Sequence, residues 1–158
     1  MEDRSRARMA ESEKKQRIRM TEGEKKVLIV DDEKEICWLL SQALSEEGYQ
    51  VSVAHSGKEG LSRVQKSGEV DLLLLDLHLP DMNGLDLLQQ VRALGLQTPT
   101  VVITAFGDEE SRERAATLGV RGFLDKPFEV STLLAALLAF SGRRRTIKLT
   151  ERRKKTWQ

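Results

Sequence analysis

The sequence has a single cysteine among its 158 residues, and it has no long hydrophobic run. Cys37 alone cannot form an internal disulfide, which is typical of proteins kept in a reducing compartment. No apolar stretch approaches the roughly 20 residues that span a bilayer, so we expect no transmembrane helix. The first residues, MEDRSRARMAESEKK, hold no apolar segment of the kind that a secretory signal needs. These absences predict a cytoplasmic protein without a membrane partner.

Charge is unevenly distributed along the chain, although the formal net charge is only +1. Residues 27–141 contain 9 Lys and Arg against 18 Asp and Glu, whereas residues 142–158 contain 8 against 1. An acidic body between two basic ends is typical of a globular domain with charged tails. We therefore expect a charged N-terminal extension (1–25), one folded domain (26–141) and a basic C-terminal tail (142–158). Because charge runs are usually solvated, we do not expect the tail to bind nucleic acid.

The body alternates short apolar runs with helical patterns, which predicts an α/β protein with a flavodoxin-like, doubly wound (βα)5 fold. Strands this uniformly apolar need helices on both faces of a parallel sheet. An eightfold barrel would need about 250 residues and is excluded by length. Five-unit sheets commonly have the strand order 2-1-3-4-5, which makes the first and third strands neighbours. The expected strands are VLIV (27–30), VSVA (51–54), DLLLL (71–75), TVVIT (100–104) and RGFL (121–124).

Acidic side chains follow two of these strands at the point where each strand ends. Asp31 and Asp32 follow the first strand, and Asp76 follows the leucines of the third. Ligands of an open parallel sheet bind outside the carboxyl ends of its strands, so these carboxylates should converge on one crevice. Converging carboxylates repel one another, and a hard divalent cation relieves the repulsion. No Cys/His metal spacing exists in the sequence, and ligands that are all oxygen atoms favour Mg²⁺.

Two further strands end in polar side chains that extend this pattern. The fourth strand ends in Thr104, and Lys126 follows the fifth. An acid nucleophile, a metal ion, an ammonium and a hydroxyl together describe a site for a phosphoryl group, with the carboxylate attacking phosphorus. Taken alone, each residue has an ordinary explanation as a helix cap, a turn acid, a strand end or a surface charge. Their joint occurrence at the carboxyl ends of the appropriate strands favours the phosphoryl site.

Four motifs, VLIVDDE, LLLLDLHLPDMNGLDLL, TVVITAFGD and GFLDKPF, resemble in this order the receiver domain of two-component response regulators. The resemblance covers about residues 26 to 140. It implies that Asp76 accepts a phosphoryl group from a phosphohistidine on a partner kinase. It also implies that Asp32 and Asp76 bind Mg²⁺ directly. Asp31 would help through water, and the backbone carbonyl of His78 would complete the ligand set.

The same resemblance implies how the protein would switch. Lys126 would contact the phosphoryl group, and Thr104 would move to hydrogen-bond it. Phe123 occupies the family's aromatic switch position and would rotate inward when Thr104 moves. The Lys126–Pro127 bond is typically cis in the family. His78 and Phe106 flank the route of water to the phosphoryl group and would tune its lifetime.

We therefore predict a stand-alone signalling receiver and not a turnover enzyme. Its phosphoryl donor would be a sensor histidine kinase or a phosphotransfer protein. The added charge would shift an equilibrium between two packings, and a downstream effector protein would dock on the face of the fourth helix, fifth strand and fifth helix. One alternative is an aspartyl-phosphate phosphatase, although such enzymes commonly carry an acid where this sequence has His78. The other is a DNA-binding regulator that acts through the basic tail.

Overall fold

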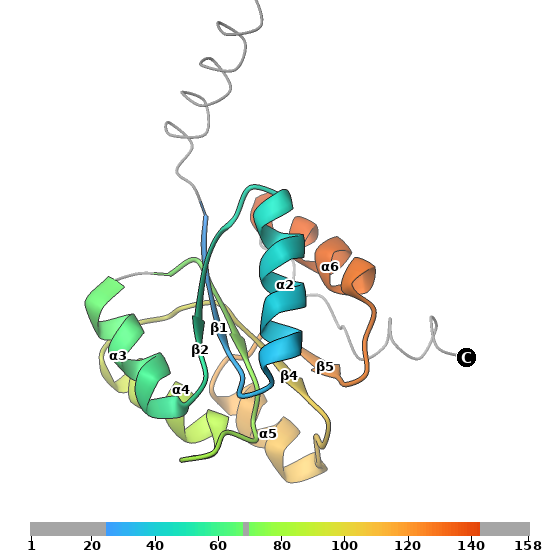
Figure 1. The fold of residues 1–158 in the computed structure, drawn as a ribbon. Coiled ribbons are helices and arrows are strands. Elements are labelled where there is room, and N and C mark those ends of the chain that lie inside the picture. Colours follow the sequence, from blue (N-terminus) through green and yellow to red (C-terminus); the bar gives the residue numbers. More distant parts are fainter. Residues whose placement is uncertain (1–24, 68–69, 143–158) are drawn as a thin grey trace, which may run out of the picture.

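The computed structural model describes residues 25–67 and 70–142, in which strands and helices alternate (Figure 1). Most of the predicted N-terminal extension and of the basic tail lies outside these residues. None of the helices in the described part is long and apolar enough to cross a membrane. The strands are β1 (Lys26–Val30), β2 (Gln50–Ala54), β3 (Leu72–Leu75), β4 (Thr100–Thr104) and β5 (Gly122–Asp125). The helices are α2 (Lys34–Glu46), α3 (Gly57–Ser67), α4 (Gly84–Ala93), α5 (Glu109–Thr117) and α6 (Val130–Gly142).

The five strands form one parallel sheet in the order β2-β1-β3-β4-β5, which confirms the predicted fold class and strand order. Strand β2 lies on one side of β1, and β3, β4 and β5 follow on its other side, so the order in which strands are added reverses at the neighbouring pair β1 and β3. Val30 pairs with Leu75 at their carboxyl ends. The backbone N–H of Asp76 donates to the carbonyl of Val30 at 2.9 Å, so the hydrogen bonding between the two strands continues one residue beyond β3. The residues that follow β1 and β3 are therefore neighbours.

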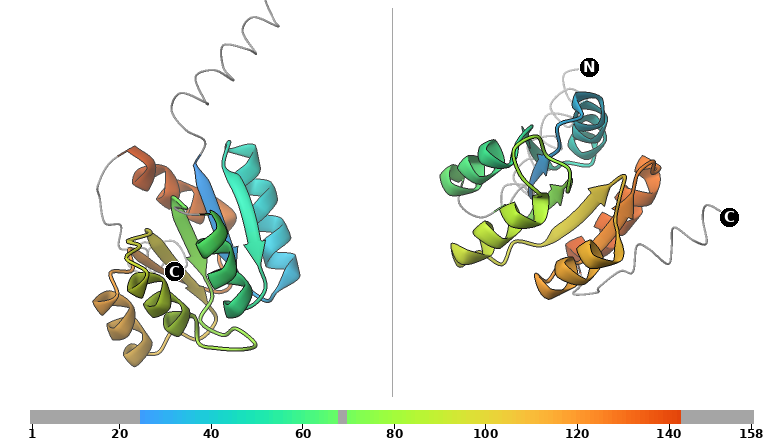
Figure 2. Two further views of the ribbon diagram at one scale, coloured as in Figure 1. Left: turned by 90° about the vertical axis from the view of Figure 1, so that its left-hand side faces the viewer. Right: turned by 90° about the horizontal axis from the view of Figure 1, so that it is seen from below.

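Helices cover both faces of the sheet, which explains why β3 consists of four leucines. Helices α2 and α6 lie on one face, and α3, α4 and α5 lie on the other (Figures 1 and 2). Successive side chains of a strand point to opposite faces. Leu72 and Leu74 accordingly pack in the core beneath α2 and α6, and Leu73 and Leu75 pack beneath the other three helices. The first position beyond this doubly covered strand is Asp76.

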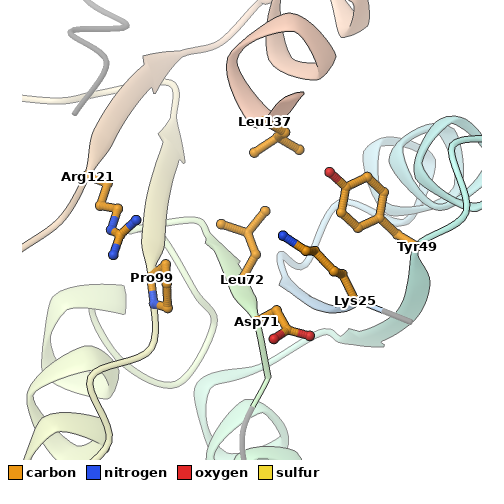
Figure 3. Close-up of a pocket in the computed structure, with 7 residues that line it drawn as sticks. All are labelled: Lys25, Tyr49, Asp71, Leu72, Pro99, Arg121 and Leu137. Carbon is orange, nitrogen blue, oxygen red and sulfur yellow. The ribbon is translucent and has the colours of Figure 1, made fainter. Parts of the chain in front are cut away.

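A small pocket lies at the opposite end of the sheet, where the strands begin (Figure 3). Its volume is about 180 Å³, and its walls include the cationic side chains of Lys25 and Arg121 and the apolar side chains of Leu72 and Leu137. Pockets for small-molecule ligands usually measure roughly 300–1,000 Å³. This pocket is smaller, and it lies away from the carboxyl ends of the strands, where ligands of such sheets bind.

Candidate functional site

Three carboxylates converge at the carboxyl ends of β1 and β3, as the sequence predicted. One oxygen each of Asp31, Asp32 and Asp76 lie within 4.8 Å of one another. Asp31 and Asp76 are 3% and 4% exposed, whereas Asp32 is open to solvent. Next to them a cleft of about 470 Å³ runs along residues 77–83, with Asp32 in its wall. The acids thus form a partly sheltered cluster with an open approach.

Lys126 brings a cation into this cluster from the end of β5. Its Nζ donates to Oδ2 of Asp31 at 2.7 Å and to Oδ2 of Asp76 at 3.2 Å. Nζ donates a third bond, of 3.1 Å, to Oε1 of Glu33, a residue that the sequence motifs did not assign to the site. The Lys126 side chain is only 8% exposed, and the Lys126–Pro127 peptide bond is cis. A buried ammonium therefore contacts both buried carboxylates at once.

Burial and charge act in opposite directions on these groups. Burial raises the pKa of Asp31 above 3.8, although the hydrogen bonds from Lys126 and from the Glu33 backbone act to lower it. Burial alone would lower the pKa of Lys126, but the hydrogen bond and charge of Asp31, together with the charge of Asp76, raise it well above 10.5. Lys126 is therefore a fixed positive charge at every physiological pH. It offsets part of the negative charge of the cluster.

Thr104 ends β4 at the same edge of the sheet, and its hydroxyl has no hydrogen-bond partner among the described residues. It is the single buried side-chain oxygen or nitrogen without a partner in the part of the chain that the structure describes. The residue itself is 0% exposed. Its backbone carbonyl accepts from the N–H of Lys126 at 2.8 Å, so the two predicted site residues are directly linked. An unpaired buried hydroxyl costs free energy, and an acceptor that reached it would recover that cost.

His78 and Phe106 contact each other, and His78 also contacts the cluster through Asp76. The backbone N–H of His78 donates to Oδ1 of Asp76 at 3.3 Å. Nε2 of His78 lies 3.3 Å from the carbonyl oxygen of Phe106, and the two rings meet edge to face with centroids 5.9 Å apart. The role of the His78 carbonyl as a metal ligand stays a prediction. The effect of this pair on a phosphoryl lifetime likewise stays a prediction.

Phe123 of β5 is buried, with 6% of its surface exposed. It packs so closely against Gly107 that a side chain at Gly107 would overlap the ring. The guanidinium carbon of Arg112 lies 4.4 Å from the ring centroid. This contact of Arg112 could not be predicted from the sequence, because a helical arginine in a charged segment carries no signal of which residues its side chain contacts. The inward rotation of Phe123 stays a prediction, and the structure places its ring in a buried position.

The residues present fit a hard divalent cation. Asp31, Asp32 and Asp76 offer carboxylate oxygens only, which are the donors that Mg²⁺ prefers. Two of these carboxylates are buried and carry one shared lysine as counter-charge, so a second cation would lower their mutual repulsion. The exposed Asp32 and the adjoining cleft leave room for the waters that Mg²⁺ usually retains.

Comparison with known proteins identifies the family. The family model of the response regulator receiver domain matches residues 27–138. The transcriptional regulatory protein CpxR of Klebsiella pneumoniae is 42% identical over 113 residues, which are 72% of this chain and 47% of that protein. The CheY-like receiver domain protein from Methanospirillum hungatei superposes with a TM-score of 0.71 at 28% identity, covering 84% of this chain and 99% of that one. The chemotaxis protein CheY4 of Vibrio cholerae gives a TM-score of 0.69 at 33% identity, covering 74% and 98%.

The chain therefore belongs to the response regulator receiver domain family of two-component signal transduction. The resemblance inferred from the sequence motifs is confirmed. Such receivers are signalling modules and not enzymes in the ordinary sense. The chain spans between 43% and 49% of the length of the curated relatives that it matches.

Proposed function

We propose that this protein is a phosphorylation-switched receiver in which Asp76 accepts a phosphoryl group from a phosphohistidine. The donor would be a sensor histidine kinase or a phosphotransfer protein. Support comes from Asp76, which contacts the buried ammonium of Lys126 and clusters with two further carboxylates, at the sheet edge where β4 ends in the unpaired hydroxyl of Thr104. This combination serves phosphoryl transfer, which depends on positioning and charge compensation more than on covalent chemistry from the protein. The proposed setting is the cytoplasm, in keeping with the buried free thiol of Cys37.

In the proposed step an oxygen of the Asp76 carboxylate forms a bond to phosphorus. The bond between phosphorus and the imidazole nitrogen breaks, and its electron pair stays on that nitrogen. Lys126 lies 3.2 Å from Asp76 and would donate to the oxygens of the transferred group. Asp31, Asp32 and Asp76 would hold Mg²⁺, which when bound compensates the negative charge of the phosphoryl oxygens. Asp31 also keeps Lys126 in place through the 2.7 Å bond.

The phosphoryl group would act as a switch through Thr104. It adds roughly −1.5 to −2 charge units and three acceptor oxygens at one point. The Thr104 hydroxyl, which is buried and unpaired among the described residues, would gain a partner by moving toward it. That movement would shift the loop between β4 and α5 and change the surface made by α5, β5 and α6. We propose this surface as the docking face for a downstream protein.

The convergence of Lys126 on Asp76 and Asp31 carries the proposal, and phosphorylation in vitro tests it. Incubation with acetyl phosphate and Mg²⁺ should add one phosphate, measured as the mass of the intact protein. The Asp76→Asn variant should take up none. The matched control is Asp86→Asn, which removes an exposed carboxylate on α4 and should leave the uptake unchanged. Equal uptake by the Asp76→Asn protein would refute the assignment.

The relatives suggest a second candidate, which is control of transcription. TrcR of Mycobacterium tuberculosis and CpxR of Klebsiella pneumoniae are named transcriptional regulatory proteins, and each is about twice as long as the region that matches this chain. In this chain, the basic segment 143–158, with 8 Lys and Arg, is the feature that favours binding to DNA. A gel shift whose salt dependence disappears on removal of residues 143–158 would support binding to DNA through the tail. Absence of any shift at low salt would leave signalling through protein contacts, including transfer of the phosphoryl group onward in a phosphorelay.

A further inference from the structure

Arg112 on α5 makes four contacts that the proposed phosphoryl chemistry does not use. Its Nε donates to the carbonyl of Gly107 at 3.2 Å. Its Nη2 donates to both carboxylate oxygens of Asp125, at 3.0 and 2.9 Å. Its guanidinium also lies over the ring of Phe123, 4.4 Å from the centroid. One side chain thus holds a loop carbonyl, a strand carboxylate and an aromatic ring.

These three partners belong to the segments that carry the site. Gly107 lies three residues after Thr104, in the loop that joins β4 to α5. Asp125 pairs with Thr104 across the sheet and is followed directly by Lys126. Phe123 precedes Asp125 by two positions, so both side chains lie on the same face of the sheet. Arg112 therefore links α5 to the parts of the chain that position the Thr104 hydroxyl and the Lys126 ammonium.

The contact between Arg112 and Asp125 is not an ordinary surface ion pair. The side chain of Asp125 is 11% exposed and that of Arg112 is 30% exposed, so solvent screens the pair only in part. The flat guanidinium fork fits a carboxylate and a ring face at the same time, which a lysine cannot do. The Arg114 side chain, two positions along the same helix, instead meets the exposed Asp86 and Gln89 on α4. Arg112 thus contacts β5 and the loop before α5, whereas Arg114, on the same helix, contacts exposed side chains of α4.

We propose that Arg112 is a positioning residue that latches the loop after Thr104 and the ring of Phe123 in the arrangement seen here. The proposal rests on the proposed phosphorylation of Asp76 and names how that site is regulated. For Thr104 to approach a phosphoryl group, the loop must shift, and the Gly107 carbonyl must leave Arg112. The contacts of Arg112 therefore stabilise the conformation seen here against the one adopted on phosphorylation. Their strength sets the equilibrium between these two conformations in the unphosphorylated protein.

A kinetic comparison tests the latch. The initial rate of phosphate uptake from acetyl phosphate with Mg²⁺ is measured for the wild type and for Arg112→Gln, Arg112→Lys, Asp125→Asn and Arg114→Gln. In this reaction an Asp76 oxygen bonds to phosphorus and acetate leaves with the electron pair of the broken bond. Removing the latch should raise the rate about threefold or more in Arg112→Gln and Asp125→Asn. Arg112→Lys should give an intermediate rate, and Arg114→Gln should match the wild type.

A second measurement separates a latch from a mere loss of structure. In the untreated Arg112→Gln protein, the amide NMR signals of Gly107 and Phe123 should move toward the positions that they take in the phosphorylated wild type. Signals of α2 and α3 should stay where they are. General broadening with an unchanged or lower uptake rate would make Arg112 a structural residue and overturn the latch.

The two proposals fail in different ways. A wild-type protein that takes up no phosphate refutes the proposed function, and the latch with it. A wild-type protein that is phosphorylated at the same rate as Arg112→Gln and Asp125→Asn refutes the latch alone.

Discussion

At the scale of single residues, Thr104 is notable because it places a polar hydroxyl in a buried environment that offers it no hydrogen-bond partner among the described residues. Its hydroxyl is buried and has no partner among the described residues, whereas the hydroxyl of Thr100 on the same strand donates to the carbonyl of Thr98 at 2.9 Å. Both residues are 0% exposed. A buried polar group without a partner weakens the fold, so the unpaired hydroxyl points to a use in another state of the protein. Replacing each of these two threonines by valine should therefore affect stability differently.

We predict that Thr104→Val leaves the free energy of unfolding unchanged within about 0.5 kcal/mol, or raises it, because valine removes an unpaired hydroxyl while keeping the shape. Thr100→Val should instead lower the free energy of unfolding by about 1 kcal/mol, since it removes a formed hydrogen bond. Urea unfolding of both variants provides the check. A loss at Thr104 as large as that at Thr100 would mean that the Thr104 hydroxyl already has a partner.

Residues at strand ends could be predicted from the sequence, and long side chains on helices could not. Asp31, Asp76 and Thr104 sit at the boundary of an apolar run, and the parallel sheet brings such boundaries together. Arg112 and Glu33 reach the site through flexible side chains from surface positions. Their partners depend on distances between elements that hydrophobic periodicity does not contain. The sequence therefore predicted which strand-end side chains lie together, and it did not predict the long side chains that contact them or their neighbours.

At the scale of elements, a carboxylate from a distant loop caps the start of α3, in addition to the local Ser56 hydroxyl, which accepts from the N–H of Glu59 at 3.1 Å. Asp81 accepts from the backbone N–H groups of Gly57 at 2.8 Å and of Lys58 at 2.9 Å. These N–H groups are the ones that a helix leaves unpaired at its first turn. Helix α4 instead has a local cap, because the Asn83 side chain directly before it accepts from the backbone N–H of Leu85 at 2.8 Å, and a cap of this kind adjoins its own helix in the sequence. A cap 24 residues away leaves no such pattern.

We predict that Asp81→Ala lowers the free energy of unfolding by about 1 kcal/mol at pH 7, as the loss of a helix cap usually does. The bonds from Lys58 and Gly57 hold the pKa of the Asp81 carboxyl below 3.8. A carboxyl whose pKa is lowered by folding stabilises the protein above its unfolded pKa and loses this effect as the pH falls through the folded value. The difference between wild type and Asp81→Ala should therefore shrink below about pH 4.

Asp81→Asn is the matched control, because it keeps the accepting oxygen and removes the charge. It should retain most of the stability at pH 7, and its difference from Asp81→Ala should not change between pH 7 and pH 3. Urea unfolding at several pH values gives both results. A difference between wild type and Asp81→Ala that stays constant down to pH 2 would show that the Asp81 charge plays no part in capping α3.

At the scale of the whole molecule, the residues within the strands of the parallel sheet pack the core, and the polar residues of the candidate site lie at or just after the ends of the strands. Its strands are covered on both faces, so Leu72 to Leu75 serve packing alone, and the polar groups appear where the cover ends. The order β2-β1-β3-β4-β5 then brings the ends of four strands to one edge. The fold could be predicted because it needs only the alternation of periods and the chain length. The cluster could be predicted because it is a consequence of that fold.

Binding of Mg²⁺ should be visible in the stability of the whole domain. A cation that binds the folded cluster and not the unfolded chain adds about 1.4 kcal/mol at a free concentration ten times its Kd. We expect the melting temperature to rise by about 5 °C under this condition, because domains of this size gain a few degrees per kcal/mol. Asp32→Asn should remove most of the rise, and Asp86→Asn should keep it, since Asp86 lies on α4 outside the cluster.

The dependence of this rise on pH tests whether the buried acid takes part. Mg²⁺ binds the ionised carboxylate, and burial raises the pKa of Asp31 above 3.8. The gain in melting temperature should therefore be full near pH 7 and should begin to fall at a higher pH than an ordinary aspartate would give. Thermal unfolding with and without Mg²⁺ between pH 4 and pH 8 measures the midpoint of this loss. An equal gain from Mg²⁺ in the Asp32→Asn protein would show that the cation binds elsewhere on the acidic body, and the cluster would lose its assignment as a metal site.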